Sequence, residues 1–346
     1  MSAAITPARL LRLRLAAQRL SPETGATSAV EAAAAVCGIQ AQDVRASRLA
    51  LRSRVRGITR EVIDADPGLA RTWTVRGTVH LIAAADRPWL HSLTAERNRA
   101  YFEQLIGRRG AADAARKALP VMVAMLGDRG PLTRAELLKS LDEHGVPSLG
   151  PRAENVLMPW ACVSGPVVGL ADGRFRATDP PPPVDGDEAL ATLGRRYLAG
   201  YGPATGADLA KWSGLPITAC RRALDAAGSL EKAGDLHALP GTLESVPPEP
   251  PAASLLAAFD TSMLGWESRE PLVRSQDNFE IVPGGGIVRA VVLARGRAVA
   301  TWRVEGGGRR RTLVLDAFGR APAKGPLATE AADVARLLDI DLRLPA

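Results

Sequence analysis

Hydrophobic and polar positions alternate along the chain with helical spacing in some segments and strand spacing in others. Two proline-rich stretches, residues 179–183 and 246–251, interrupt these patterns. Consecutive prolines cannot continue a helix interior, so both stretches are predicted to be extended linkers. The pattern therefore divides the chain into a first half, a middle segment and a C-terminal unit that begins near Ala252.

One pattern occurs twice. Residues 130–137 (GPLTRAEL) match residues 202–209 (GPATGADL), and in each copy a threonine precedes an acidic residue by three positions. This spacing is typical of a capping box, so each threonine is expected to begin a helix.

The segments after these helices complete the same outline. The later copy predicts helices over 207–213 and 218–227, followed by two short strands around Gly234. In the earlier copy, strand-like residues 167–170 and 175–177 flank an Asp-Gly pair, which is a strong hairpin signal. A helix-turn-helix followed by a hairpin is the outline of a winged-helix domain.

A degenerate third copy is expected near the N-terminus, with a capping box at residues 28–31 and strands over 71–75 and 78–82. We therefore predict an α+β fold of tandem winged-helix domains with a C-terminal β-rich unit. The alternative is a generic α/β sequence in which the repeat match is chance. The predicted units are winged-helix domains at 1–118, 119–183 and 184–248, and a C-terminal unit at 249–346.

The C-terminal unit is expected to be mostly β, with strands over 287–294, 298–304 and 313–315 and a helix over 328–338. A glycine-rich tip at 306–311 carries three arginines between two strands. Such a tip can contact phosphates or the minor groove, or it can be a solvated hairpin loop. The arginines are Arg309, Arg310 and Arg311.

The net charge of the chain suggests the kind of partner that the protein binds. The 346 residues include 44 basic and 37 acidic side chains, and five of the basic residues are lysines, which leaves 39 arginines. A basic excess favours an anionic partner such as nucleic acid, although the codon usage of a GC-rich genome would produce the same bias. The three cysteines have no zinc or disulfide spacing. No apolar run is long enough to span a membrane, so a cytoplasmic protein is expected.

The segment GIQAQD at residues 38–43 is the most unusual local feature. Gly38 should end the preceding helix, and on the extended chain that follows Gln40 and Gln42 would share one face. Two carboxamides would then project together. Two glutamines near a helix end are also common as surface or capping residues, so spacing alone leaves both interpretations open.

At this point the sequence resembles the winged-helix DNA glycosylases typified by AlkZ and YcaQ. The matching segments extend over nearly the whole chain in the family's order. They are residues 38–43 (GIQAQD), 76–81 (RGTVHL), 259–260 (FD), 264–266 (LGW) and 283–286 (PGGG). The resemblance implies that Gln40 and Gln42 hold the hydrolytic water. The Gln-x-Gln form also implies that the chain is similar to one branch of this family, which is associated with bacteria that resist their own DNA-alkylating antibiotic.

Such a pair limits the chemistry. A carboxamide can orient water but is a poor general base, so the leaving base must depart easily, as a cationic purine alkylated at N7 or N3 does. Bulky adducts or interstrand crosslinks are included in this class. Asp43 is expected to cap a helix or form an ion pair. No lysine lies near the motif, so we expect a monofunctional glycosylase without a lyase step, a metal or a cofactor.

The expected partner is double-stranded DNA with alkylated bases, bound by a monomer at the bacterial nucleoid. The candidate DNA contacts are Arg45, Arg48, Arg52, Arg76, His80 and the arginines of the 306–311 tip. Arg48 and Arg52 are four positions apart and would share a helical face, which could equally be an ordinary solvated face. The competing functions are a non-catalytic tandem winged-helix regulator and a drug-sequestering protein.

Overall fold

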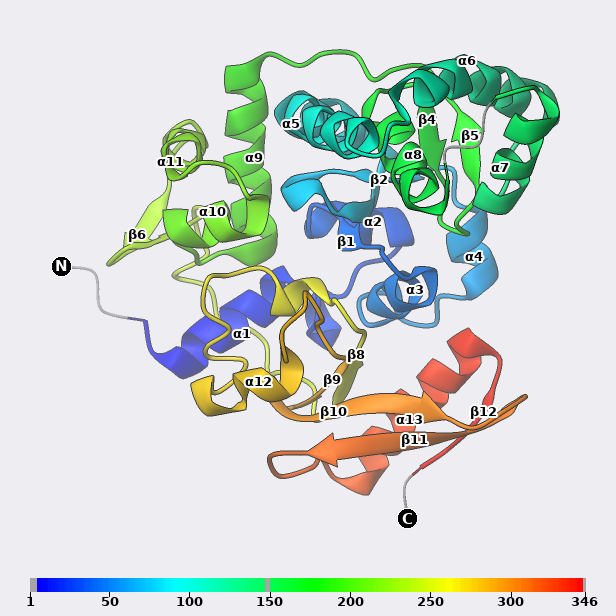
Figure 1. Ribbon diagram of the computed structural model, residues 1–346. Coiled ribbons are helices and arrows are strands. Elements are labelled where there is room, and N and C mark those ends of the chain that lie inside the picture. Colours follow the sequence, from blue (N-terminus) through cyan, green and yellow to red (C-terminus); the bar gives the residue numbers. More distant parts are fainter. Residues whose placement is uncertain (1–4, 147–149, 345–346) are drawn as a thin grey trace.

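A computed structural model describes residues 5–146 and 150–344 and shows a mixed α and β protein (Figure 1). The described residues form two five-stranded sheets and one two-stranded hairpin; most of the helices lie around the first sheet and the hairpin, and the second sheet lies at one edge with α13 (Lys324–Leu338) beside it. The α+β class is therefore confirmed. No helix in this part of the chain is long and apolar enough to cross a membrane.

The first sheet combines strands from two segments that are far apart in the sequence. Its order is β1-β3-β2-β4-β5. A single pairing, Arg71 with Gly169, joins β2 to β4, so the hairpin of the second predicted unit extends the strands of the first. The strands are β1 (Ile39–Gln40), β2 (Leu69–Trp73), β3 (Val79–Ala83), β4 (Val167–Gly169) and β5 (Phe175–Ala177).

The capping boxes predicted at Thr133 and Thr205 are present, whereas at residues 28–31 Ser28 caps α2 (Ala29–Ala35) but the Glu31 carboxylate accepts from Thr27 instead of Ser28. Thr133 begins α7 (Arg134–Glu143) and Thr205 begins α10 (Gly206–Ser213), each with reciprocal side-chain and backbone hydrogen bonds. After α10, Gly214 adopts a left-handed conformation that turns the chain into the next helix. The predicted helix-turn-helix and hairpin therefore follow in order, as α11 (Ile217–Asp225), β6 (Glu231–Ala233) and β7 (Leu236–Ala238).

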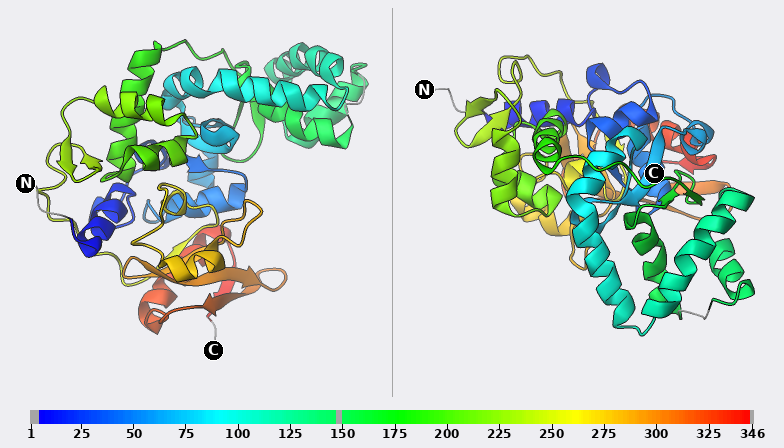
Figure 2. Two further views of the ribbon diagram at one scale, coloured as in Figure 1. Left: turned by 60° about the vertical axis from the view of Figure 1, so that its left-hand side comes forward. Right: turned by 90° about the horizontal axis from the view of Figure 1, so that it is seen from above.

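The remaining helices surround two separate apolar cores. One core runs through the N-terminal, middle and C-terminal segments, and the other belongs to the lobe formed by α6, α7, α8 and the end of α5, which projects from the body in Figure 2. The helix α6 crosses the expected boundary at 118/119. These helices are α1 (Pro7–Ala17), α2 (Ala29–Ala35), α3 (Val44–Arg52), α4 (Arg60–Ala65), α5 (Arg87–Gly107), α6 (Ala112–Arg129), α8 (Pro151–Val163), α9 (Gly186–Tyr201), α12 (Asn278–Ile281) and α13 (Lys324–Leu338).

The C-terminal unit is built on the second sheet, in the order β12-β11-β10-β9-β8. The predicted strand at 287–294 begins four residues late, because Ile287 forms a turn with Gly284. The strands are β8 (Ser254–Leu256), β9 (Val291–Ala294), β10 (Arg297–Glu305), β11 (Arg310–Ala317) and β12 (Asp341–Arg343).

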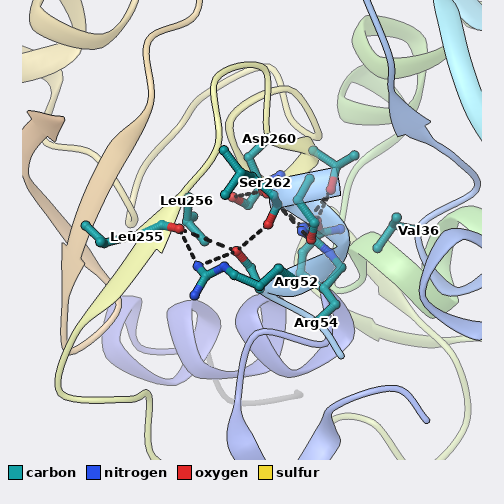
Figure 3. A network of polar contacts seen from close by, with 12 residues as sticks. Val36, Arg52, Arg54, Leu255, Leu256, Asp260 and Ser262 are labelled. Carbon is teal, nitrogen blue, oxygen red and sulfur yellow. Dashed lines mark hydrogen bonds and ion pairs between the residues drawn. The ribbon is translucent and has the colours of Figure 1, made fainter. Parts of the chain in front are cut away.

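A buried ion pair joins the C-terminal unit to the segment after α3 (Figure 3). Arg54 donates to both carboxylate oxygens of Asp260, at 2.8 and 3.0 Å, and both side chains are fully buried. Burial alone would raise the pKa of Asp260, but the Arg54 guanidinium and the donors of Ser262 outweigh it and lower the pKa. This pair fixes the C-terminal end of the helix that follows the glutamine motif.

Candidate active site

The glutamine motif lies on a short extended segment between α2 and α3. Gly38 ends the helical path with a φ of 107°, and a Cβ there would approach Ile82 Cγ2 to 2.8 Å. Glycine is therefore required both for the backbone conformation and for the close contact. The chain then pairs with β3 as β1, and this extended backbone places alternate side chains on one face.

The two amides meet as the extended segment predicts. Gln40 Nε2 donates a hydrogen bond of 3.2 Å to Gln42 Oε1. Gln40 is buried, with 6% of its surface exposed, whereas Gln42 is exposed to solvent. The pair therefore extends from the protein interior to a surface that a large substrate can reach.

Arg76 fixes the buried end of this pair. It lies in the short turn between β2 and β3 and donates to Gln40 Oε1 at 3.3 Å and to the carbonyl of Trp212. In the described part of the chain no carboxylate lies within ion-pair distance of its guanidinium. Burial lowers the pKa of Arg76. The sequence analysis predicted that Arg76 contacts DNA. In this structure its hydrogen bonds go to the motif and to the end of α10.

His80 lies beside Gln40 and is 3% exposed. Its Nδ1 is 2.9 Å from Thr74 Oγ1 and 3.0 Å from the carbonyl oxygen of Thr78. Burial, helped by the charge of Arg76, lowers the pKa of His80 to about 3, so the imidazole is neutral near pH 7. This side chain supports the sheet behind the amide pair, and it is not exposed for contact with a phosphate.

Asp43 has the structural position expected of it. Its carboxylate accepts a 2.7 Å hydrogen bond from the Ala46 backbone N–H and caps α3. A carboxylate at this position satisfies a backbone donor and interacts favourably with the helix dipole. The site chemistry therefore centres on two uncharged amides, with a neutral imidazole and one guanidinium behind them.

The arginines that follow the motif have different environments. Arg45 is exposed and has no side-chain partner among the described residues. Arg48 makes two hydrogen bonds to Asp64, at 2.8 and 2.7 Å. Arg52 is 3% exposed and donates to the Leu255 carbonyl at 2.7 Å.

Arg52 also forms ion pairs with Glu330 and Asp333 of α13. The structure thus corrects the expected surface placement of Arg52. Acids from distant parts of the chain neutralise both Arg48 and Arg52, so these two residues do not form a free cationic face. Their positions favour a role in holding α3 in place.

The arginine-rich tip between β10 and β11 belongs to the second sheet. Arg309 pairs with Asp339 at 2.8 Å, while Arg311 donates to the carbonyls of Gly306 and Gly308. Arg310 is exposed, and within the described residues its side chain has no partner. The tip is therefore an ordered turn on which Arg310 is the cation most available to a ligand.

Sequence reasoning missed two contributors to the site. Asn98 of α5 is 2% exposed and donates to the Thr74 carbonyl at 2.7 Å, which supports the turn carrying Arg76. Trp212 of α10 contributes a backbone carbonyl. An asparagine at an otherwise apolar helix face gives a weak signal, whereas a backbone acceptor gives none.

Comparison with known proteins extends over nearly the whole chain. Residues 33–338 match the family described as DNA glycosylase AlkZ-like. The interstrand DNA cross-link repair glycosylase of Streptomyces sahachiroi is 30% identical over 365 residues, which covers 96% of each chain. The solved structure of the Streptomyces sahachiroi DNA glycosylase AlkZ has a TM-score of 0.75 at 20% identity, covering 99% of this chain and 100% of that one. That structural likeness establishes a shared fold.

Proposed function

The chain belongs to the AlkZ-like DNA glycosylase family, and from this premise we propose that it hydrolyses the N-glycosidic bond of purines alkylated at N7 or N3 in duplex DNA. The observation that carries the proposal is the contact between Gln40 and Gln42, with one amide buried and the other exposed. These residues hold and orient the attacking water.

The chemistry of the pair selects the substrate. Cleavage of a glycosidic bond passes through an oxocarbenium-like state that water attacks at the anomeric carbon. Amides orient that water without removing its proton efficiently. A purine alkylated at N7 or N3 carries a positive charge and leaves as a neutral base, so it needs little further assistance. An undamaged base would not leave readily from such a site.

We infer a tandem winged-helix arrangement at 1–118, 119–183 and 184–248, supported by the helix-turn-helix and hairpin of α10, α11, β6 and β7. In this arrangement α6 crosses the boundary between the first two units, and its buried side chains belong to the apolar core of the second. Winged helices commonly bind duplex DNA. A non-catalytic regulator would not need two converging amides, and family membership favours the enzyme.

Duplex DNA is bound through arginines that remain free of acidic partners. Arg45 lies three residues after Gln42, and Arg310 lies at the start of β11. Both are exposed and contact phosphates in this proposal, and the neighbouring Arg309 and Arg311 of the tip exchange their present contacts for DNA. Neutralised phosphates release counterions, so affinity falls steeply with salt.

The physiological substrate is a bulky N7 adduct or an interstrand crosslink. The Streptomyces relative is named for cross-link repair, and a genotoxic antibiotic made by the same bacterium is the proposed source of the damage. The protein acts as a monomer in the cytoplasm, at the nucleoid. The reaction leaves an intact abasic strand without a lyase step, because no lysine lies near the motif in the sequence.

The test incubates the protein with duplexes carrying N7-methylguanine or an N7-linked nitrogen mustard crosslink. We expect release of the alkylated base and strand cleavage only after heat or alkali. An undamaged duplex is the matched control. Tight binding with no base release from either lesion would support the regulator instead, and strand cleavage without alkali would contradict a monofunctional reaction.

A further inference from the structure

Arg76 is a half-buried arginine with no acidic partner among the described residues, and it donates to the side chain of a motif glutamine. Its guanidinium donates hydrogen bonds to the side chain of Gln40 and to the backbone carbonyl of Trp212. Removing a guanidinium from water without a carboxylate partner is costly. A charge kept at such a cost beside the motif needs an explanation that the water-holding role of the glutamines does not supply.

The protein holds this side chain in one position. Arg76 adopts a φ of 56°, in the left-handed region that side-chain-bearing residues rarely occupy. A Cβ added at Gly214 would lie 3.2 Å from Arg76 Cγ, so the turn after α10 closes over the arginine. Trp212 lies in the last turn of α10, where helix carbonyls lack partners and carry partial negative charge. That helix end stabilises the guanidinium in place of a carboxylate.

The hydrogen bonds between Arg76, Gln40 and Gln42 fix the orientation of both amides. A guanidinium can only donate hydrogen bonds, so the group that Gln40 turns toward it must be the amide oxygen. The Nε2 of Gln40 must then face Gln42, which must present its own oxygen in return. One lone pair of Gln42 Oε1 and both Nε2 hydrogens of Gln42 remain available to a ligand.

We propose that Arg76 is a positioning residue that sets the orientation of both amides and thereby selects which atoms of Gln42 meet the water. This inference rests on the proposed function. Without Arg76, the Gln40 amide can rotate by 180°, and its oxygen would then repel Gln42 Oε1 until the second amide rotated as well. The site would then divide its population among several hydrogen-bonding patterns.

The first experiment measures single-turnover base release from N7-methylguanine DNA at saturating enzyme. Arg76→Ala is expected to slow release by about 10- to 100-fold, as the loss of a supporting hydrogen-bond partner commonly does, with the DNA dissociation constant changed less than about threefold. Arg76→Lys should recover part of the rate. Arg97→Ala is the matched control, because Arg97 donates to Gly214 of the same turn without touching an amide, and it should release base at the wild-type rate.

A double-mutant cycle separates positioning from direct DNA contact. If Arg76 acts through Gln40, Arg76→Ala should have no further effect in a Gln40→Ala background. Independent, multiplicative losses would overturn the proposal. So would a wild-type rate in Arg76→Ala while Gln40→Ala is slow, and that outcome would leave the proposed function intact. Full activity in Gln40→Ala would instead contradict the proposed function itself.

A spectroscopic readout covers the case in which a variant is too slow to assay. The Gln40 side-chain amide hydrogens should be protected from solvent exchange in the wild-type protein, because one of them is bonded to Gln42. Loss of this protection in a folded Arg76→Ala protein is the expected result. Unchanged protection and chemical shifts would show that Gln40 does not depend on Arg76.

Discussion

Gln40 of β1 lies directly opposite His80 of β3 in the antiparallel register of the first sheet. The same register places Thr72 of β2 on the other side of His80. A row of polar side chains therefore crosses three strands behind the candidate site. Because burial lowers the pKa of His80 to about 3, the residue opposite Gln40 brings no titrating charge to the proposed water-holding pair near pH 7.

The first prediction concerns the pH dependence of catalysis. With the pKa of His80 lowered to about 3, its protonation state does not change between pH 5.5 and 8. Single-turnover rates on N7-methylguanine DNA should show no inflection due to His80 in this range. A step near pH 6.5 that disappears in His80→Gln would show that the imidazole titrates during catalysis.

The same shift predicts how stability depends on pH. The unfolded chain binds a proton at His80 near pH 6.5, whereas the folded chain resists it down to about pH 3. The free energy of unfolding should therefore fall as the pH drops below 6.5, by up to about 1.4 kcal/mol per pH unit from this group. Urea titrations at several pH values give the free energy of unfolding at each pH. A plot of this free energy against pH should have a shallower slope for His80→Gln than for the wild-type protein. Equal slopes in both proteins would refute the assignment.

The buried pair of Arg54 and Asp260 predicts a large loss of stability. Removing one partner leaves the other charge buried and uncompensated, at a cost of about 3–5 kcal/mol. Arg54→Met should show this loss in urea unfolding at pH 7. Arg303→Ala is the matched control, since its ion pairs are exposed, and it should change little. Similar behaviour of the two variants would mean that the buried pair does not hold the C-terminal unit.

The candidate DNA-binding arginines should separate into a class that contacts DNA and a class that stabilises the fold. Arg45→Ala and Arg310→Ala should each weaken DNA binding and reduce the slope of log affinity against log salt by about 1. Arg52→Ala should instead lower the free energy of unfolding, because its partners lie within the protein. Fluorescence anisotropy at several salt concentrations measures the slopes. Unchanged slopes in the Arg45→Ala and Arg310→Ala variants would show that these two side chains do not contact phosphates.

Local features were predictable from the sequence because neighbouring residues determine them. The capping boxes at Thr133 and Thr205 depend on residues three positions apart. The placement of the Gln40 and Gln42 side chains on one face follows from Gly38 ending the helix and from the extended backbone after it. Each of these involves short stretches in which side-chain direction follows from backbone geometry.

The features that could not be predicted depend on contacts between distant segments. Arg48 and Arg52 have helical spacing typical of an exposed face, and only the fold brings acids from α4 and α13 against them. Likewise, nothing near Gly169 indicates that β4 pairs with β2. The acceptor on Trp212 that holds Arg76 is a backbone carbonyl, which any residue would provide.

The most direct test of the central claim compares Gln40→Ala and Gln42→Ala with Gln104→Ala, an exposed glutamine on α5. Release of N7-methylguanine from duplex DNA is measured under single-turnover conditions, with DNA affinity measured in parallel. We expect rates reduced by about 100-fold or more in the two motif variants, with affinity retained and with Gln104→Ala at the wild-type rate. Wild-type rates in both motif variants, with DNA still bound, would contradict it.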